Sequence, residues 1–281
     1  MRVPPPTTRE PSNEAKGLDL RESTLTHQGS PDAIEPSWKG LYRLSGILMV
    51  VVGISGIAAS RLGATLYSSG YPNTPTAYLQ LVSQNQVLAN GLWSLWIVAD
   101  LMLIAPSVAL YLILRRYNRT LALVGTLLSG FYIFYDISVT ELNSLTLVSL
   151  SQGYAGATTD ALRASYTAAA TYGYAALPLQ TVLSFGIGAV GWLLWSLLMA
   201  KSVFRRTTAA FGVIVNVIGI VGSASPVVPS SSILGLFQFL AVPLTGFWFI
   251  LVGFQLRRHS RQLALLDGTG QSVPQTPIVG Q

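Results

Sequence analysis

The chain has 281 residues, of which 51% are apolar and only 10% are charged, and its mean hydropathy is +0.50. Soluble domains carry roughly 25% charged residues, so this composition excludes a water-soluble globular protein and predicts a membrane protein. The absence of cysteine excludes disulfides, thiolate metal sites, iron–sulfur clusters and cysteine nucleophiles. The net charge of +6 is gathered at the ends of apolar runs, which indicates membrane topology rather than nucleic-acid binding.

The two ends of the chain are predicted to be tails. Residues 1–37 are rich in proline, serine, threonine and charge and lack apolar periodicity, so we predict a disordered cytoplasmic tail. No apolar stretch follows Arg2, as a signal peptide would require. Residues 263–281 are predicted to form a second flexible cytoplasmic tail, although Leu263 to Leu266 would also prolong the last helix. Residues 38–262 are the predicted transmembrane domain.

Six apolar stretches between the tails are long enough for a hydrocarbon core of about 30 Å, which needs about 20 helical residues. Helices are expected because a strand or loop would leave unpaired backbone groups in lipid. The predicted spans lie near residues 41–62, 91–114, 120–140, 179–200, 207–226 and 232–256. The predicted fold class is therefore all-α, a polytopic membrane helical bundle with six transmembrane helices.

The basic residues predict the orientation of this bundle. They cluster before the first span and after the second, fourth and sixth spans, and of the 17 basic residues only Arg61 and Arg163 fall on the opposite side. Lysine and arginine are retained in the cytoplasm. We therefore expect both termini to be cytoplasmic, in a multi-pass protein of the plasma or inner membrane.

Two outer connections are long enough to form helices of their own. Residues 74–90 are predicted to form an amphipathic interfacial helix capped by Thr74 or Thr76. Residues 158–176 are alanine-rich and predict a helix capped by Thr158 or Thr159, with a bend at Pro178 before the fourth span. Fusion of either helix with the span that follows is equally compatible with the sequence.

Two carboxylates lie inside predicted spans, Asp100 in the second and Asp136 in the third, and Glu141 lies at the outer exit of the third. An ionised carboxylate in hydrocarbon costs roughly 2.5–3.5 kcal/mol even on the lenient insertion scale, so each needs a partner, water or a proton. Asp100 precedes Arg115 by 15 residues and Asp136 follows Arg119 by 17. The two acids therefore share one level in the outer half of antiparallel neighbours.

Helical spacing places each acid among other polar residues. Tyr132 precedes Asp136 by one turn in the third span. Asn216 in the fifth span and Gln238 in the sixth lie on further stripes of small residues. We therefore hypothesise one water-accessible pocket in the outer half, where Asp100 and Asp136 share a proton or bind a cation or a polar ligand.

A structural role is the competing interpretation of the same residues. Stripes of small and weakly polar residues are ordinary packing surfaces between membrane helices. A tyrosine hydroxyl or a tryptophan N–H can satisfy Asp100 locally. Asp136 lies about five residues from the predicted outer boundary, where water could hydrate it. Both interpretations stay open from the sequence.

Catalysis lacks the necessary groups, and we expect neither an enzyme nor a cofactor. The histidines, His27 and His259, lie in a tail and beside the last span, so no haem, zinc or Ser/His site can form within the membrane. The pair Asp100 and Asp136 is similar to the paired aspartates of intramembrane proteases, but IVADLM lacks the Gly-x-Gly-Asp context. No glycine-rich phosphate-binding motif is found either.

Two functional interpretations follow. The first is a non-catalytic membrane protein with a role in assembly, sensing or the cell envelope. The second is a small-solute or ion carrier that uses an outer-half pocket around Asp100 and Asp136. The expected partners are the lipid bilayer and either further copies of the chain or other membrane proteins, with no nucleic acid and no metal site.

A family resemblance rests on several sequence features. They are YRLSG at the start of the first span, an amphipathic segment before the second, ALYLILRRYNRTLALVG across the second turn, and a basic turn after the fourth span. In these features residues 39–260 resemble a family of six-helix bacterial and archaeal membrane proteins classed as a domain of unknown function. The resemblance implies six helices and supplies no catalytic or binding residues.

Overall fold

A computed structural model describes residues 38–225 and 232–269, and all regular structure in these two ranges is helical. The elements in chain order are α2 (Lys39–Leu66), α3 (Pro75–Gln84), α4 (Gln86–Leu114), α5 (Arg119–Tyr135), the π-helix η2 (Asp136–Glu141), α6 (Leu142–Gly156), α7 (Asp160–Met199), α8 (Arg206–Ser223) and α9 (Ser232–Thr269). Six stretches are long and apolar enough to cross a membrane: α2, α4, the continuous helix 119–156, α7, α8 and residues 234–262 of α9. The prediction of an all-α membrane bundle with six spans is confirmed.

The surface of the bundle is apolar, as lipid contact requires. Large hydrophobic side chains are exposed on most spans, with Phe134 at 70%, Phe239 at 63% and Leu127 at 62% of their full accessible area. A soluble monomer rarely exposes large contiguous apolar patches. Hydrocarbon rather than water is therefore the solvent of this surface.

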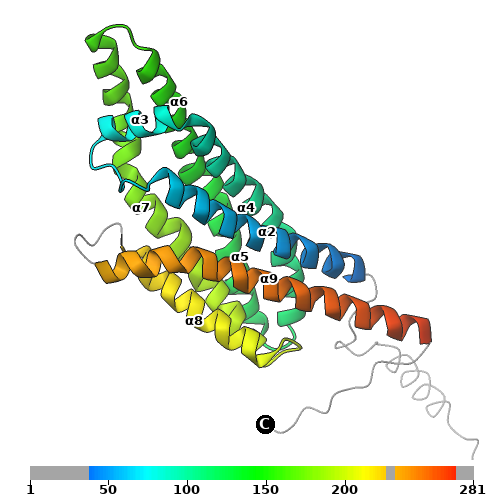
Figure 1. Ribbon diagram of the computed structural model, residues 1–281. Helices are drawn as coiled ribbons and strands as arrows, with labels where there is room; N and C mark the ends of the chain where they lie inside the picture. Colours follow the sequence, from blue (N-terminus) through cyan, green and yellow to red (C-terminus); the bar gives the residue numbers. More distant parts are fainter. Residues whose placement is uncertain (1–37, 226–231, 270–281) are drawn as a thin grey trace, which may run out of the picture.

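The bundle has two unlike ends, which we name by their residues. The basic end holds the α4–α5 turn (115–118) and the α7–α8 connection (200–205), both rich in arginine and lysine. The capped end holds the α2–α3 loop (67–74), α3 and the α6–α7 turn (157–159). In Figure 1 the α6–α7 hairpin extends at the capped end, and α3 lies beside it and packs on both helices.

Two helices are longer than the sequence analysis predicted. The helix of α5, η2 and α6 has 38 residues and α7 has 40, or about 57 and 60 Å, which is nearly twice the hydrocarbon core. The third span, predicted over 120–140, continues to Gly156 because polar residues after 141 pack on α3 and α7. The segment 158–176 is fused with the fourth span and continues through Pro178.

The predicted helix starts in the capped end are confirmed at the atomic level. The Thr74 hydroxyl accepts a hydrogen bond from the Ala77 N–H, and the Thr159 hydroxyl accepts one from the Leu162 N–H. Between α3 and α4 the backbone leaves the helical region at Asn85. The interfacial segment 74–90 is therefore a short separate helix followed by the first turns of α4.

At the capped end, four tyrosines pack the α2–α3 loop and α3 against α2 and α7. They are Tyr67, Tyr71, Tyr78 and Tyr174. Their rings contact one another, and Tyr71 stacks on Tyr174 at 6.4 Å between centroids. The Tyr174 hydroxyl donates to the carbonyl of Pro72. Burial raises the pKa of Tyr78 above its usual value, so its hydroxyl stays neutral and its ring packs like an apolar group.

Glycines bring α2 and α9 into direct backbone contact. A Cβ atom on Gly53 would lie 2.3 Å from the carbonyl oxygen of Gly246, and one on Gly253 would lie 2.7 Å from that of Gly46. Small residues at such positions let membrane helices approach closely. This glycine stripe, which includes the GISG segment, is helix-packing surface.

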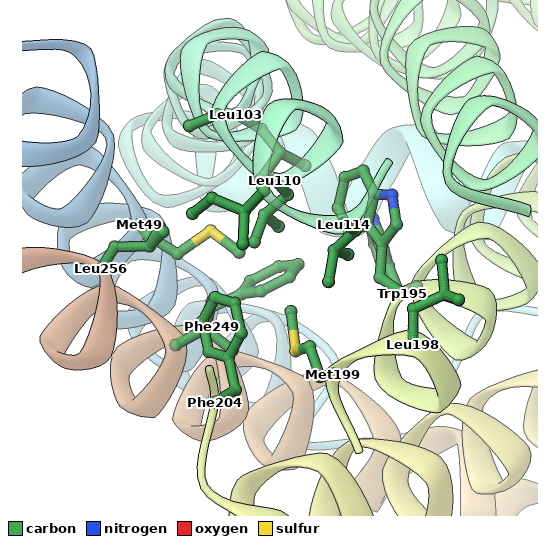
Figure 2. Packing of buried hydrophobic residues seen from close by; sticks show 14 of the residues in the cluster. Met49, Leu103, Leu110, Leu114, Trp195, Leu198, Met199, Phe204, Phe249 and Leu256 are labelled. Carbon is green, nitrogen blue, oxygen red and sulfur yellow. The ribbon is translucent and has the colours of Figure 1, made fainter. Parts of the chain in front are cut away.

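The basic half of the interior is a closed apolar core. Leu103, Leu110 and Leu114 on α4 belong to one buried cluster with Met49 of α2 and Phe249 of α9 (Figure 2). The same cluster includes Trp195, Leu198, Met199, Phe204 and Leu256. The interior of the basic half is therefore mostly apolar, with buried polar contacts such as that of Asn216 with Ser196 between α7 and α8.

The predicted tails fall mostly outside the described residues. Residues 1–37 and 270–281 belong to this part of the chain. Residues 263–269, predicted to begin the carboxy-terminal tail, continue α9 as far as Thr269. The helical extension over Leu263 to Leu266 is thus part of the observed helix.

Candidate functional site

Three carboxylic acids meet inside the bundle. Asp100 of α4 and Asp136 and Glu141 of η2 each offer a carboxylate oxygen, and these three atoms all lie within 4.8 Å of one another. The three residues, here called the carboxylate triad, are 2%, 9% and 1% exposed, respectively. Within the described ranges no lysine or arginine forms an ion pair with them. When its acids are ionised, the triad therefore concentrates negative charge in a region of low dielectric.

The π-helix explains why Asp136 and Glu141 point the same way. In an α-helix each residue turns about 100°, so two residues five apart would diverge by about 140°. A π-helix is bonded from residue i to residue i+5, which places such residues one above the other. Residues 136–141 adopt this form. This one widened turn adds Glu141 to the site.

The polar partners of the triad leave several of its oxygens unused. The Tyr132 hydroxyl donates a hydrogen bond to Asp100 Oδ1 at 2.8 Å. Asp100 Oδ2 and both carboxylate oxygens of Glu141 are buried and have no hydrogen-bond partner. The Ser184 hydroxyl on α7 lies beside Asp136. An unpartnered buried carboxylate oxygen is costly, so a proton or a cation at the triad would lower that cost.

A cavity adjoins the triad on the side of α2 and α9. It is small, with a volume of about 30 Å³, and its wall includes Asp100, Tyr132 and Thr245. Most of the remaining wall is aromatic or aliphatic and includes Trp96 of α4 and Trp192 of α7. Asp100 thus borders both the cavity and the two acids of η2.

Polar side chains continue from the triad toward the capped end and toward the middle of the bundle. Ser129 contacts Ser107 across the α4–α5 interface at 3.3 Å. Beyond the triad, Asn143 donates to the Gln180 side chain and to the Gly173 carbonyl, both at 2.9 Å. The polar column comprises Asp100, Ser107, Ser129, Tyr132, Asp136, Glu141, Asn143, Gln180 and Ser184. From Ser129 to Asn143 it extends about 20 Å along the third span.

The structure separates the predicted site residues into two groups. Asp100, Tyr132 and Asp136 come together as described. Asn216 lies at the α7–α8 contact, where its amide donates to the Gly212 carbonyl at 2.7 Å and to Ser196. Gln238 lies where α9 meets α8, against Gly222. Neither Asn216 nor Gln238 lines the cavity beside Asp100.

Glu141 is the site residue that sequence reasoning did not include. The sequence places it at the outer exit of the third span, because the predicted span ends at residue 140. At 1% exposure it is as buried as any core residue. A signal was present in the run DISVTE, since an acid five residues after a membrane-embedded acid needs a partner wherever it lies.

The donor set of the site is purely oxygen. Carboxylates are surrounded by the hydroxyls of Tyr132 and Ser184, and the chain has no cysteine. His259 lies at the basic end, where its ring contacts Tyr42 and adjoins Arg116. His27 lies outside the described residues. Asp100, Asp136 and Glu141 are therefore the residues that could hold a metal ion.

Comparisons of this chain with protein-family models, with curated proteins and with solved structures find no match. The resemblance to a six-helix family of unknown function stays a prediction.

Proposed function

We propose that this protein is a membrane carrier for a cation, which binds at the carboxylate triad. The observation that carries the proposal is the meeting of three buried carboxylates within 4.8 Å without a basic partner in the described ranges. Three negative charges at that spacing repel one another strongly in a medium of low dielectric. A cation that enters the site removes this repulsion, so binding is favourable there.

The unpartnered oxygens favour a binding site over a purely structural cluster. A polar group that serves only to join helices finds its partners in the folded chain, as Asn143 does with Gln180. Glu141 has no such partner for either oxygen, and its burial costs several kcal/mol. Membrane-embedded acids kept at such a cost are functional candidates by default.

The surroundings of the triad support transport by alternating access. The polar column offers hydrogen-bonding groups on both sides of the triad, and the buried apolar cluster around Leu110 and Leu114 lies toward the basic end (Figure 2). A carrier needs a binding site within the membrane that communicates with one side at a time. The triad is at most 9% exposed, and buried apolar clusters lie toward both ends of the bundle, so the described arrangement matches an occluded state.

The proposal includes an orientation and a membrane. The basic end faces the cytoplasm because arginine and lysine are retained there, so the capped end faces outward in the plasma or inner membrane. Both termini are then cytoplasmic. Ions arriving from outside would meet the polar column first.

The test is tracer uptake into liposomes that contain the purified full-length protein. Radioactive calcium, manganese, rubidium and sodium are offered separately, and proton movement is followed with an entrapped pH dye. We expect uptake of at least one of these cations, and Asp100→Asn lowers it by at least about 100-fold, the loss that follows when a binding residue is removed. Asp160→Asn removes an exposed acid from the start of α7 and is the matched control with unchanged uptake.

Size-exclusion chromatography in detergent shows whether each variant is folded. Equal uptake by wild type and Asp100→Asn overturns the carrier proposal, as does the absence of movement for every cation and for protons.

A second candidate function is assembly with other membrane proteins or with further copies of the chain. The α6–α7 hairpin favours it, since both helices continue well past the length of the hydrocarbon core. Tyr172 on this hairpin is 84% exposed. Loss of an oligomer on Tyr172→Ala, measured by mass photometry in nanodiscs, would support assembly. A monomeric wild type that transports cations would count against it.

A further inference from the structure

We propose that the ion carried is a hard divalent cation, which Asp100, Asp136 and Glu141 ligate together. This inference rests on the proposed function and names its substrate class. It starts from Glu141, which is 1% exposed and aims two unpartnered oxygens into a cluster whose other members are also acids. Asp136 is hydrogen-bonded within the site, whereas both oxygens of Glu141 and Asp100 Oδ2 have no partner, which makes them available as ligand atoms.

The charge of the site favours two positive charges over one. When all three carboxylates are ionised, their total charge is −3, and a monovalent cation would leave a net charge of −2 in the bundle. A divalent ion leaves −1, and the Tyr132 hydroxyl already donates to Asp100. Residual charge is expensive where the dielectric is low and no lysine or arginine of the described ranges is paired with the site.

The dimensions of the triad suit a divalent ion. Calcium binds oxygen at about 2.3–2.6 Å, so two oxygens on opposite sides of the ion are about 4.6–5.2 Å apart. The three carboxylate oxygens lie within 4.8 Å of one another. One ion can thus touch all three acids without a rearrangement of α4 or η2.

The chemistry of the donors decides the class of divalent ion. Carboxylate and hydroxyl oxygens suit magnesium, calcium and manganese, whereas zinc and copper prefer imidazole and thiolate. Among the described residues the imidazole of His259 is remote, because it lies at the basic end, and the chain has no thiol. Magnesium gives up its bound water reluctantly, and the triad is 9% exposed at most. We therefore expect calcium and manganese to bind more tightly than magnesium.

Tyr132 acts as a positioning residue for this site. Its hydrogen bond engages Asp100 Oδ1 and leaves Oδ2 without a partner. Groups that orient a metal ligand in this way typically change metal affinity by about 10–100-fold when removed. Tyr132→Phe should therefore weaken binding within that range and leave the number of sites unchanged.

The experiment titrates the purified full-length protein in detergent with manganese, after treatment with a chelator, and follows free manganese by electron paramagnetic resonance. We expect one site per chain. Calcium should displace manganese, magnesium should do so weakly, and sodium or potassium in large excess should not. Glu141→Gln should lose at least about 100-fold in affinity, more than Tyr132→Phe, while Asp160→Asn matches wild type.

Several outcomes would overturn the assignment. They are an undiminished free-manganese signal, an equal loss of affinity in Asp160→Asn and Glu141→Gln, and displacement by sodium or potassium as effective as by calcium. If Glu141→Gln does not fold, Asp100→Asn replaces it, and the rise in melting temperature on adding manganese to wild type provides a second measurement.

The results of the binding and transport experiments distinguish failure of the divalent-ion proposal from failure of the carrier proposal. Triad-dependent movement of rubidium, sodium or protons without manganese binding would refute the divalent ion and leave the carrier standing. Triad-dependent manganese binding without movement of any ion would confirm the site and refute the carrier.

Discussion

The two halves of the bundle interior differ although the same helices build both. In the basic half, α4 contributes Leu110 and Leu114 to a closed apolar core (Figure 2). In the capped half, the same helix contributes Asp100 to a cluster of three acids. Outside, both halves present apolar side chains to lipid. The difference between them is therefore confined to the interior.

This contrast separates what holds the bundle together from what it does. Packing and close backbone approach stabilise membrane helices, and the apolar core and the glycine contacts of α2 with α9 supply both. The carboxylate triad adds repulsion and unpartnered oxygens. Buried charges often cost stability relative to apolar residues of similar size. Under the proposed function, the capped half thus keeps three acids that bind the cation at a cost in stability.

Replacing a leucine of α4 by an acid, and its acid by a leucine, should change stability and cation uptake more than any other variant. Leu110→Asp places a lone carboxylate in the closed core and should cost several kcal/mol, so we expect little folded protein. Asp100→Leu removes repulsion and should leave the melting temperature unchanged or higher, while cation uptake is lost. Thermal unfolding in detergent and tracer uptake measure the two consequences. If Asp100→Leu unfolds as readily as Leu110→Asp, the acids are structural and the contrast between the halves fails.

Single-residue deletions in the third span should distinguish its two helical forms. A π-helical turn holds one residue more than an α-helical turn in the same place. Deletion of Ser138 should therefore convert η2 into an α-helical turn. Asp136 and Glu141 would then stand four residues apart, on one face of the helix. We expect manganese affinity within about tenfold of wild type. Deletion of Gly130, also exposed and with open space around it, turns all that follows by about 100°.

The Gly130 deletion should therefore lose manganese binding by at least about 100-fold, beyond the range for the loss of an orienting group, and chromatography should show aggregation. The comparison matters more than either result alone. Equal damage from both deletions would mean that the π-helix does not control the position of Glu141.

The sequence predicted the spans well because hydrocarbon imposes a length and an apolar composition that a single chain displays. It also placed Asp100 opposite Asp136, since the short turn at 115–118 fixes the register of α4 and α5. It did not predict Glu141, because a π-helical turn has no periodic signature over six residues. It did not predict the length of α6 either, because the polar residues of this helix find their partners on α7, as Asn143 does with Gly173 and Gln180.

Two truncations one turn apart on α4 should lower the stability of the protein by smaller and unequal amounts. One lies in the apolar core and the other in the polar column. Leu110→Ala removes a fully buried side chain from the apolar core and should cost about 2–5 kcal/mol. Ser107→Ala removes a hydroxyl that contacts Ser129 and the Leu103 carbonyl and should cost about 1 kcal/mol. Melting temperatures in detergent rank the two. A larger loss for Ser107→Ala would show that the polar column also supports the fold.

The smallest expected effect concerns the helix start at the far tip of the capped half. Thr159→Ala removes the hydroxyl that accepts from the Leu162 N–H, which should cost about 1 kcal/mol. Thr158→Ala is the matched control, because Thr158 is equally exposed and the cap of α7 is Thr159. Hydrogen exchange of the first turn of α7 should accelerate in Thr159→Ala alone, with cation uptake unchanged in both. The start of α7 is remote from the triad, so slower uptake in Thr159→Ala would mean that the α6–α7 hairpin takes part in transport. The functional part of the bundle would then include this hairpin as well as the triad.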